Sequence, residues 1–142
     1  MSELSSVVIR SKPEWFEMTA PGNPNHLFGY GREITSAAIA QVKANIFELM
    51  AMSADFVHRH NVSEETYWIQ EDSCLVEFWL DGNVVIAEPG ERVIIAPGAW
   101  HATRPVSQAT GSSSSHILVV ASPPFSEKDQ EFMASQPEGW LE

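Results

Sequence analysis

The stretch HRHNVSEE, residues 58–65, holds the densest group of chemically active side chains in this sequence of 142 residues. Residues i and i+2 of a β-strand point to the same face, so His58 and His60 would present two imidazoles side by side. Asn61 to Ser63 tolerate a turn, and Glu64 or Glu65 would then return a carboxylate toward the imidazoles. The stretch therefore predicts two strands, joined by a turn, that form half of a metal site.

The segments around this stretch are short, apolar and separated by turn residues, which is the pattern of an all-β protein. Asp81-Gly82 is a strong signal for a two-residue hairpin, because both residues tolerate the positive φ angles of a type I′ turn. Several strands at this spacing indicate a barrel or a sandwich. The predicted strands lie in FVHRH, ETYWI, CLVEFWL, NVVIA, RVIIA and HILVV.

The second half of the site is predicted near residues 97–101, PGAWH. A Pro-Gly turn after RVIIA would place His101 at the start of the next strand. A third imidazole would then be available beside His58 and His60.

These residues resemble the two motifs of the cupin superfamily, which are small double-stranded β-helix (jelly-roll) barrels. In the first motif, over residues 52–72, His58, His60 and Glu65 fit the family pattern. In the second, over residues 90–105, the residues in register are Gly90, Gly98 and His101. The chain departs from the motifs only at positions that shape turns, and these are Met52, Asp72, Ala96 and Pro105.

The resemblance implies one divalent metal ion per chain, bound by His58, His60, Glu65 and His101. Fe(II) is the first expectation, and Mn, Ni, Co, Cu and Zn accept the same ligands. Glu65 is favoured over Glu64 because six further residues lead to the turn-prone pair at 72–73. A bulge within residues 61–63 would invert the alternation and select Glu64 instead.

The resemblance also implies a metal-dependent enzyme for a small-molecule substrate. A dioxygenase is expected first, and a redox-neutral isomerase, lyase or cyclase is the other enzymatic possibility. The alternative is a non-catalytic module that binds a small molecule. The candidate catalytic residues are Tyr67, His116 and Arg104.

Each of these three residues also has a purely structural interpretation. Tyr67 would line a substrate cavity or belong to the core, as would Phe78, Trp79 and Trp100. His116 would act as a general acid-base, contact a metal ligand, or lie at the rim of the barrel without a chemical role. Arg104 would bind a substrate carboxylate or form an ion pair on the surface. His26 is expected to be exposed, and Cys74 to be a small buried side chain.

The length predicts one domain in three parts. Residues 1–34, rich in Pro, Gly and aromatic residues, are expected to form an irregular arm that packs on the barrel or on a partner subunit, which suggests a homodimer. Residues 35–125 form the barrel, with 41–52 as a strand despite their helical propensity and GSSSS, 111–115, as a loop. Residues 126–142 form a tail with a short helix near 126–134, because Ser126 suits an N-cap.

Composition excludes several classes of function. The net charge of −11 argues against nucleic acid and anionic membranes as partners. The single cysteine, Cys74, excludes an intramolecular disulfide and the cysteine-rich zinc sites. No apolar run approaches the roughly 20 residues of a membrane span, and the N-terminus lacks a signal-peptide pattern, so a cytoplasmic location is expected.

Overall fold

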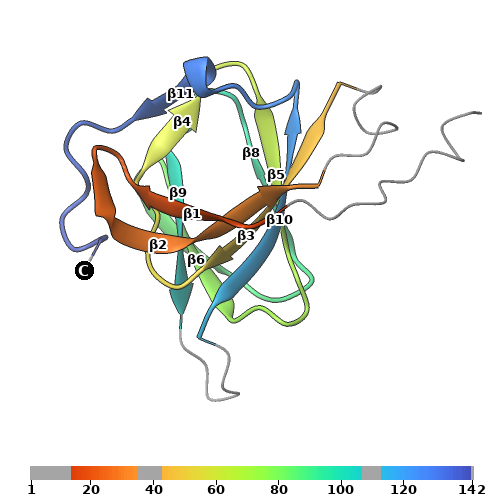
Figure 1. The fold of residues 1–142 in the computed structure, drawn as a ribbon, viewed down its shortest axis with the longest axis vertical. Coiled ribbons are helices and arrows are strands. Elements are labelled where there is room, and N and C mark those ends of the chain that lie inside the picture. Colours follow the sequence, from red (N-terminus) through yellow and green to blue (C-terminus); the bar gives the residue numbers. More distant parts are fainter. Residues whose placement is uncertain (1–13, 35–42, 107–112, 142) are drawn as a thin grey trace, which may run out of the picture.

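The computed structural model describes residues 14–34, 43–106 and 113–141, which form two antiparallel sheets (Figure 1). The six-stranded sheet has the order β1-β2-β3-β10-β5-β8, and the five-stranded sheet has the order β11-β4-β9-β6-β7. The strands are β1 Phe16–Ala20, β2 Asn23–Glu33, β3 Asn45–Ala51, β4 His58–His60, β5 Glu64–Ile69, β6 Leu75–Leu80, β7 Asn83–Ala87, β8 Arg92–Ile95, β9 His101–Val106, β10 Ser115–Ser122 and β11 Gln130–Phe132, with a 3-10 turn, η2, at Glu127–Asp129.

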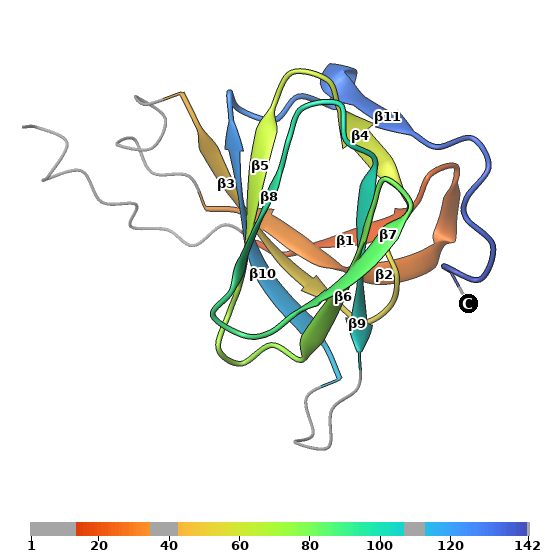
Figure 2. The same ribbon diagram turned by 180° about the vertical axis from the view of Figure 1, so that it is seen from behind.

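The order of β3 to β10 is that of a jelly roll, because the chain alternates between the sheets except at the β6–β7 hairpin. All six predicted segments contain a strand, and β3 confirms the strand assignment within residues 41–52 as far as these are described. The two sheets form opposite walls of the molecule in both views (Figure 1, Figure 2). The described residues contain no helix long and apolar enough to cross a bilayer.

The hairpin between β6 and β7 has the predicted two-residue turn. Leu80 pairs directly with Asn83, and Asp81 and Gly82 have φ angles of 46° and 93°. Positive φ at both central residues is the signature of the type I′ turn, which matches the twist of the strands it joins. The prediction from the Asp-Gly pair is confirmed.

The core lies between the sheets and follows the two-residue period of the strands. On β5, Glu65, Tyr67 and Ile69 are buried, whereas the residues between them are more exposed. Phe78 and Ile117 are fully buried in the same cluster, so Phe78 belongs to the core. Cys74 is buried and free, as predicted for a small apolar side chain.

The prediction of an irregular N-terminal arm is wrong for its described part. Residues 16–33 form the hairpin β1–β2, whose second strand pairs with β3. The glycines that suggested an irregular segment have specific positions in this hairpin. Gly22, with φ of 73°, belongs to its turn, Gly29 lets the backbone of β2 approach that of β3, and Gly31 leaves room for the Phe47 ring.

The predicted C-terminal helix is wrong beyond its first turn. Ser126 does cap this turn, since its hydroxyl accepts the amide N–H of Lys128. The chain then turns into β11, because residues 130–132 pair with the outer edge of β4, whose other edge pairs with β9. Pairing satisfies backbone groups that an edge strand would leave open. The GSSSS loop lies partly outside the described residues, and Ser115 already begins β10.

Gly29 gives a test of the packing of β2 on β3. A Cβ at this position would lie 2.8 Å from the Cα of Ala51 and closer still to the carbonyl oxygen of Met50. We expect Gly29→Ala to lower the free energy of unfolding by about 1–3 kcal/mol, because backbone atoms must move.

Gly31→Ala is the matched comparison. Its Cβ would meet the end of the Phe47 ring and, at 2.9 Å, the sulfur of Met18, and both are side-chain ends that can shift. Denaturant unfolding should therefore show a smaller loss. Equal losses in the two variants would contradict the close backbone approach at Gly29.

Candidate metal centre

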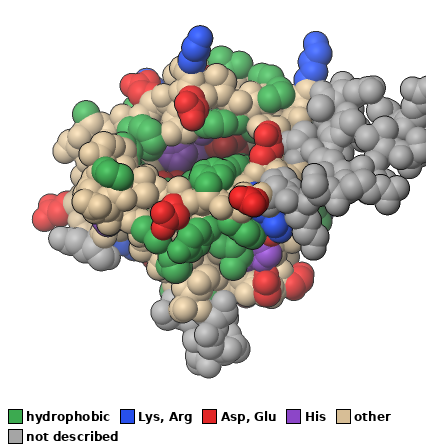
Figure 3. Space-filling view, in the orientation of Figure 1, with side chains coloured by type: hydrophobic (Ala, Val, Ile, Leu, Met, Phe, Trp, Pro, Cys, Tyr) green, Lys and Arg blue, Asp and Glu red, His purple; other side chains and the backbone are tan. Residues whose placement is uncertain are grey.

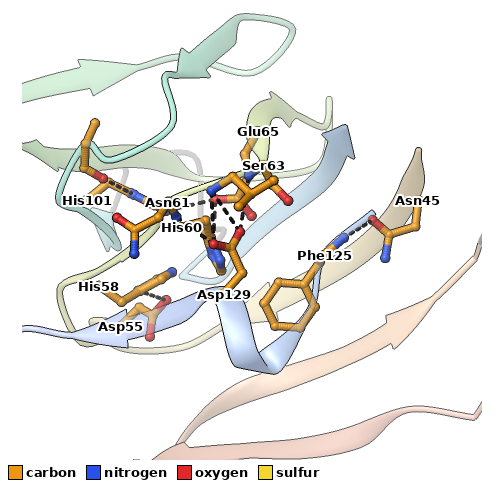
Figure 4. Close-up of polar contacts among 12 residues, drawn as sticks. Asn45, Asp55, His58, His60, Asn61, Ser63, Glu65, His101, Phe125 and Asp129 are labelled. Atoms are coloured by element: carbon orange, nitrogen blue, oxygen red, sulfur yellow. Dashed lines mark hydrogen bonds and ion pairs between the residues drawn. The ribbon is translucent and has the colours of Figure 1, made fainter. Parts of the chain in front are cut away.

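Four buried side chains converge at one point between the sheets (Figure 4). His58 and His60 come from β4, Glu65 from β5 and His101 from β9. Their potential ligand atoms all lie within 4.8 Å of one another. His58 pairs directly with His101 across β4 and β9, so strand register places their rings 4.5 Å apart between centroids.

Backbone carbonyls orient two of the imidazoles. Nδ1 of His58 lies 2.7 Å from the oxygen of Phe56, and Nδ1 of His101 lies 2.9 Å from the oxygen of Ala99. A carbonyl only accepts, so each Nδ1 carries the proton and donates. In the neutral ring, Nε2 then presents a lone pair, which is the form that binds metals.

The carboxylate of Glu65 faces these lone pairs. Its Oε1 lies 2.9 Å from Nε2 of His101 and 3.5 Å from Nε2 of His60. Glu65 Oε1, His101 Nε2 and His60 Nδ1 are buried without an aligned hydrogen-bond partner. Glu65 Oε1 and Nε2 of a neutral His101 are both acceptors, and two buried acceptors 2.9 Å apart need a proton or a cation between them, so this group fits a single divalent ion.

The pKa values reflect this crowding. Burial opposes ionisation of Glu65, but the hydrogen bond and charge of His101 outweigh it and lower the pKa of the carboxyl. Burial likewise opposes protonation of His101, and Glu65 outweighs it and raises the pKa of that imidazole. Burial dominates at His60, whose pKa is lowered. The two shifts favour a proton between Glu65 and His101, and a cation at this point would compete with that proton.

A cavity of about 540 Å³ lies over this group. His58, His60 and Glu65 line it, whereas His101 is only 1% exposed and lies outside the lining. Figure 3 shows the hollow with histidine at its base and acidic side chains around it. The volume is in the range of small-molecule sites.

The structure brings Glu65, and not Glu64, to the histidines. Glu64 is exposed on the outer face of β5, and β5 and β10 pair without a register shift. The bulge that would have inverted the alternation is therefore absent from the described loop and strand. Tyr67, two residues on, lines the same cavity, and burial raises the pKa of its hydroxyl well above the usual value, so it stays protonated.

The other two catalytic candidates lie away from the cavity. Arg104 donates two 3.0 Å hydrogen bonds to the carboxylate of Glu77, and its guanidinium lies 4.4 Å from the ring centroid of Trp140. His116 lies between the carboxylates of Glu48 and Asp72. These contacts occupy both side chains in structural ion pairs.

The remaining aromatic and histidine candidates also lie outside the lining. Trp79 and Trp100 pack against a second apolar cluster that contains Trp140, and Arg59 covers the ring of Trp100. His26 is exposed and contacts the ring of Phe56, as predicted for an exposed histidine.

Sequence reasoning missed Asp55, which lines the cavity beside the centre. Its Oδ2 lies 3.8 Å from Nδ1 of His58, and burial raises its pKa. The short spacing between Asp55 and His58 could have indicated that the two side chains lie close together. An aspartate three residues before a strand is common in loops, however, so the spacing alone is a weak signal.

Sequence reasoning also missed Asp129, which ties the C-terminal segment to the loop between β4 and β5 by hydrogen bonds. These hydrogen bonds are called the latch below. Its carboxylate accepts the amide N–H groups of Asn61, Val62 and Ser63 at 2.9–3.2 Å (Figure 4). That loop joins the strand of His58 and His60 to the strand of Glu65. No local pattern announces this contact, because the partners are more than 60 residues apart.

Comparisons with known proteins find no matching family model and no matching curated protein. Among solved structures, a single-residue variant of Streptomyces Pac13 with uridine aligns at 15% identity and a TM-score of 0.65, covering 85% of this chain and 84% of that one. KdgF from Halomonas sp. aligns at 12% identity and 0.57, covering 78% and 86%. The chain has the cupin fold.

Pac13 is described as a nucleoside dehydratase. Oxalate decarboxylase from Bacillus subtilis aligns at 17% identity and a TM-score of 0.57, over 75% of this chain but only 28% of that longer one. At these identities the likeness concerns the fold.

Removal of the Asp129 carboxylate tests whether the latch orders the metal centre. We expect Asp129→Ala to weaken metal binding about tenfold, because partners that orient ligands typically contribute 10- to 100-fold to affinity. Isothermal titration with Zn²⁺ measures the change. Asp72→Ala, which removes an exposed carboxylate outside the cavity, is the control. Equal affinities in the two variants would count against the latch.

His116 predicts a pH dependence of stability. Burial opposes its protonation, but hydrogen bonds to Glu48 and Asp72 outweigh it and raise its pKa above 6.5. The stabilisation of the fold by protonated His116 is thus fully present below pH 6.5, the ordinary pKa of histidine. It is lost as the pH rises through the higher pKa of His116 in the folded state. His116→Gln should abolish this step in melting temperature against pH. His26→Gln, the control, should retain the step. A step that persists in His116→Gln would show that another group causes it.

Proposed function

We propose that this chain is a metal-dependent enzyme whose single divalent ion is held by His58, His60, Glu65 and His101. The supporting observation is the convergence of four buried ligand side chains, whose ligand atoms lie within 4.8 Å of one another, at the base of a cavity of about 540 Å³. A purely structural ion does not require such a cavity.

When bound, the ion would supply Lewis-acid chemistry at a substrate oxygen, since three imidazoles and one single-atom carboxylate leave about two positions of an octahedron open. The chain supplies the remaining functions. The Tyr67 hydroxyl is a proton donor within the cavity, and the Asp55 carboxyl, whose pKa burial raises, is a second titratable group there. Phenyl rings in the lining exclude water from the substrate.

Within this proposal we favour a redox-neutral reaction, such as elimination of water or isomerisation. A protonated hydroxyl, Tyr67, and a titratable carboxyl, Asp55, beside a Lewis acid suit that chemistry, because it requires groups that give and take protons. It is also the chemistry described for the structural neighbour Pac13, a nucleoside dehydratase. The second candidate is an Fe(II) dioxygenase, which the open positions of the ligand set support. Absence of turnover with a bound ligand would point to the non-catalytic binding module.

Metal analysis of ligand variants tests the centre. We expect one divalent ion per wild-type chain purified without a metal-affinity tag, and loss of stoichiometric metal in His58→Ala and in His101→Ala. The variants should keep the circular dichroism of the folded sheets, because the core does not depend on either ring. His116→Ala is the control and should keep the ion. Full metal content in either ligand variant would refute the assignment.

Oxygen dependence separates the two reactions. Metal-loaded protein is incubated with candidate substrates in sealed cells, with and without oxygen. Turnover that persists without oxygen and with redox-inert Zn²⁺ or Mg²⁺ supports the redox-neutral reaction. Oxygen consumption that requires Fe(II) would replace it with the dioxygenase.

The homodimer inferred from the aromatic N-terminal arm stays a prediction. Trp15 and Phe16 are 39% and 51% exposed, which leaves apolar surface at the start of β1. Light scattering should give twice the chain mass of 15.7 kDa. A strict monomer would reject it.

A further inference from the structure

The lining of the cavity combines aromatic rings with acidic side chains. Rings come from β1, β2 and β3 on one side and from the C-terminal segment on the other. The phenyl rings of the lining are Phe16, Phe28, Phe47, Phe125 and Phe132. Flat apolar rings on facing walls favour a planar or apolar body between them.

The charged lining residues are all acidic. Asp55 and Glu65 lie deep beside the histidines, and Glu17 and Glu127 are exposed lining residues and therefore belong to the mouth. Among the described residues, the lining contains no Lys or Arg. Lys128 follows Glu127 in the 3-10 turn but lies outside the lining, and two arginines are paired elsewhere. Arg32 pairs with Glu48, and Arg59 pairs with Glu131.

This arrangement is unfavourable for a phosphorylated substrate. Proteins bind phosphate with charge-assisted donors, above all Arg and Lys. At this mouth a phosphate would lose water, meet two carboxylates and gain no cationic partner from the described lining, and juxtaposed like charges cost several kcal/mol. The one compensating cation would be the ion at the opposite, buried end.

We infer that the substrate is an uncharged molecule with a planar aromatic ring, bound with its ring between the phenyl walls and an oxygen toward the metal centre. This inference rests on the proposed metal-dependent function and adds the chemical class of its substrate. The cavity volume of about 540 Å³ suits a molecule of nucleoside size and would be left mostly empty by a two-carbon acid.

Matched pairs of probes, which differ only in a phosphate, test the charge selection. Calorimetry with Zn²⁺-loaded protein would compare uridine with uridine 5′-monophosphate, adenosine with adenosine 5′-monophosphate, and phenyl glucoside with its 6-phosphate. We expect at least one neutral member to bind, and each neutral member that binds to do so about tenfold or more tightly than its phosphorylated partner.

Charge reversal at the mouth tests the cause. Glu17→Lys combined with Glu127→Lys should raise the affinity for the phosphorylated probes about tenfold or more and change that for neutral probes far less. Glu64→Lys combined with Glu88→Lys makes the same change in net charge at exposed positions outside the lining. That control should leave the selectivity unchanged.

The outcomes separate this inference from the proposed function. Failure of every neutral probe at millimolar concentration, tighter binding of any phosphorylated probe, or equal effects of the two double variants would overturn the inference. Stoichiometric metal, measured separately, would leave the metal-dependent function standing in each case. Absence of metal from the wild-type chain would instead remove the proposed function itself.

Discussion

The pairing of β4 with β9 brings His58 opposite His101, and β5 adds Glu65 to the same buried point. Several hydrogen-bond acceptors thus face one another away from water, an arrangement that is stable only with a proton or a cation between them. Backbone carbonyls hold two of the rings so that their lone pairs point inward. The requirement for a positive charge at this point explains the pKa shifts of Glu65 and His101 and supports the proposed metal.

The rest of the molecule stabilises that arrangement. The strand β4 has only three residues, so its position depends on its neighbours on both sides. On the outer side, β11 pairs with it, and Asp129 binds the loop that leads to β5. The rings of Phe125 and Phe132 contact His60 and His58. The C-terminal segment therefore belongs to the centre rather than forming a separate tail.

The errors in the sequence prediction share one cause. Ser126 does cap a helical turn, since its hydroxyl accepts the N–H of Lys128. Beyond that turn, however, the backbone pairs with the open edge of β4 and does not continue as a helix. The glycines of the N-terminal arm suggested irregularity, whereas Gly29 permits close contact with β3. In both places a partner distant in sequence outweighed a local preference.

The sequence by itself determined the strands from β4 to β10, the Asp81-Gly82 turn and the fact that Glu65, Tyr67 and Ile69 share one face of β5, because these follow from a two-residue period and from the φ angles that Asp and Gly tolerate. The spacing of His58 and His60 placed both on one face for the same reason. Only the tertiary structure decided that Asp55 and a set of phenyl rings share the cavity, that Arg104 and His116 are engaged elsewhere, and that Asp129 braces the centre. These facts arise from contacts between strands far apart in the chain, which no local pattern encodes.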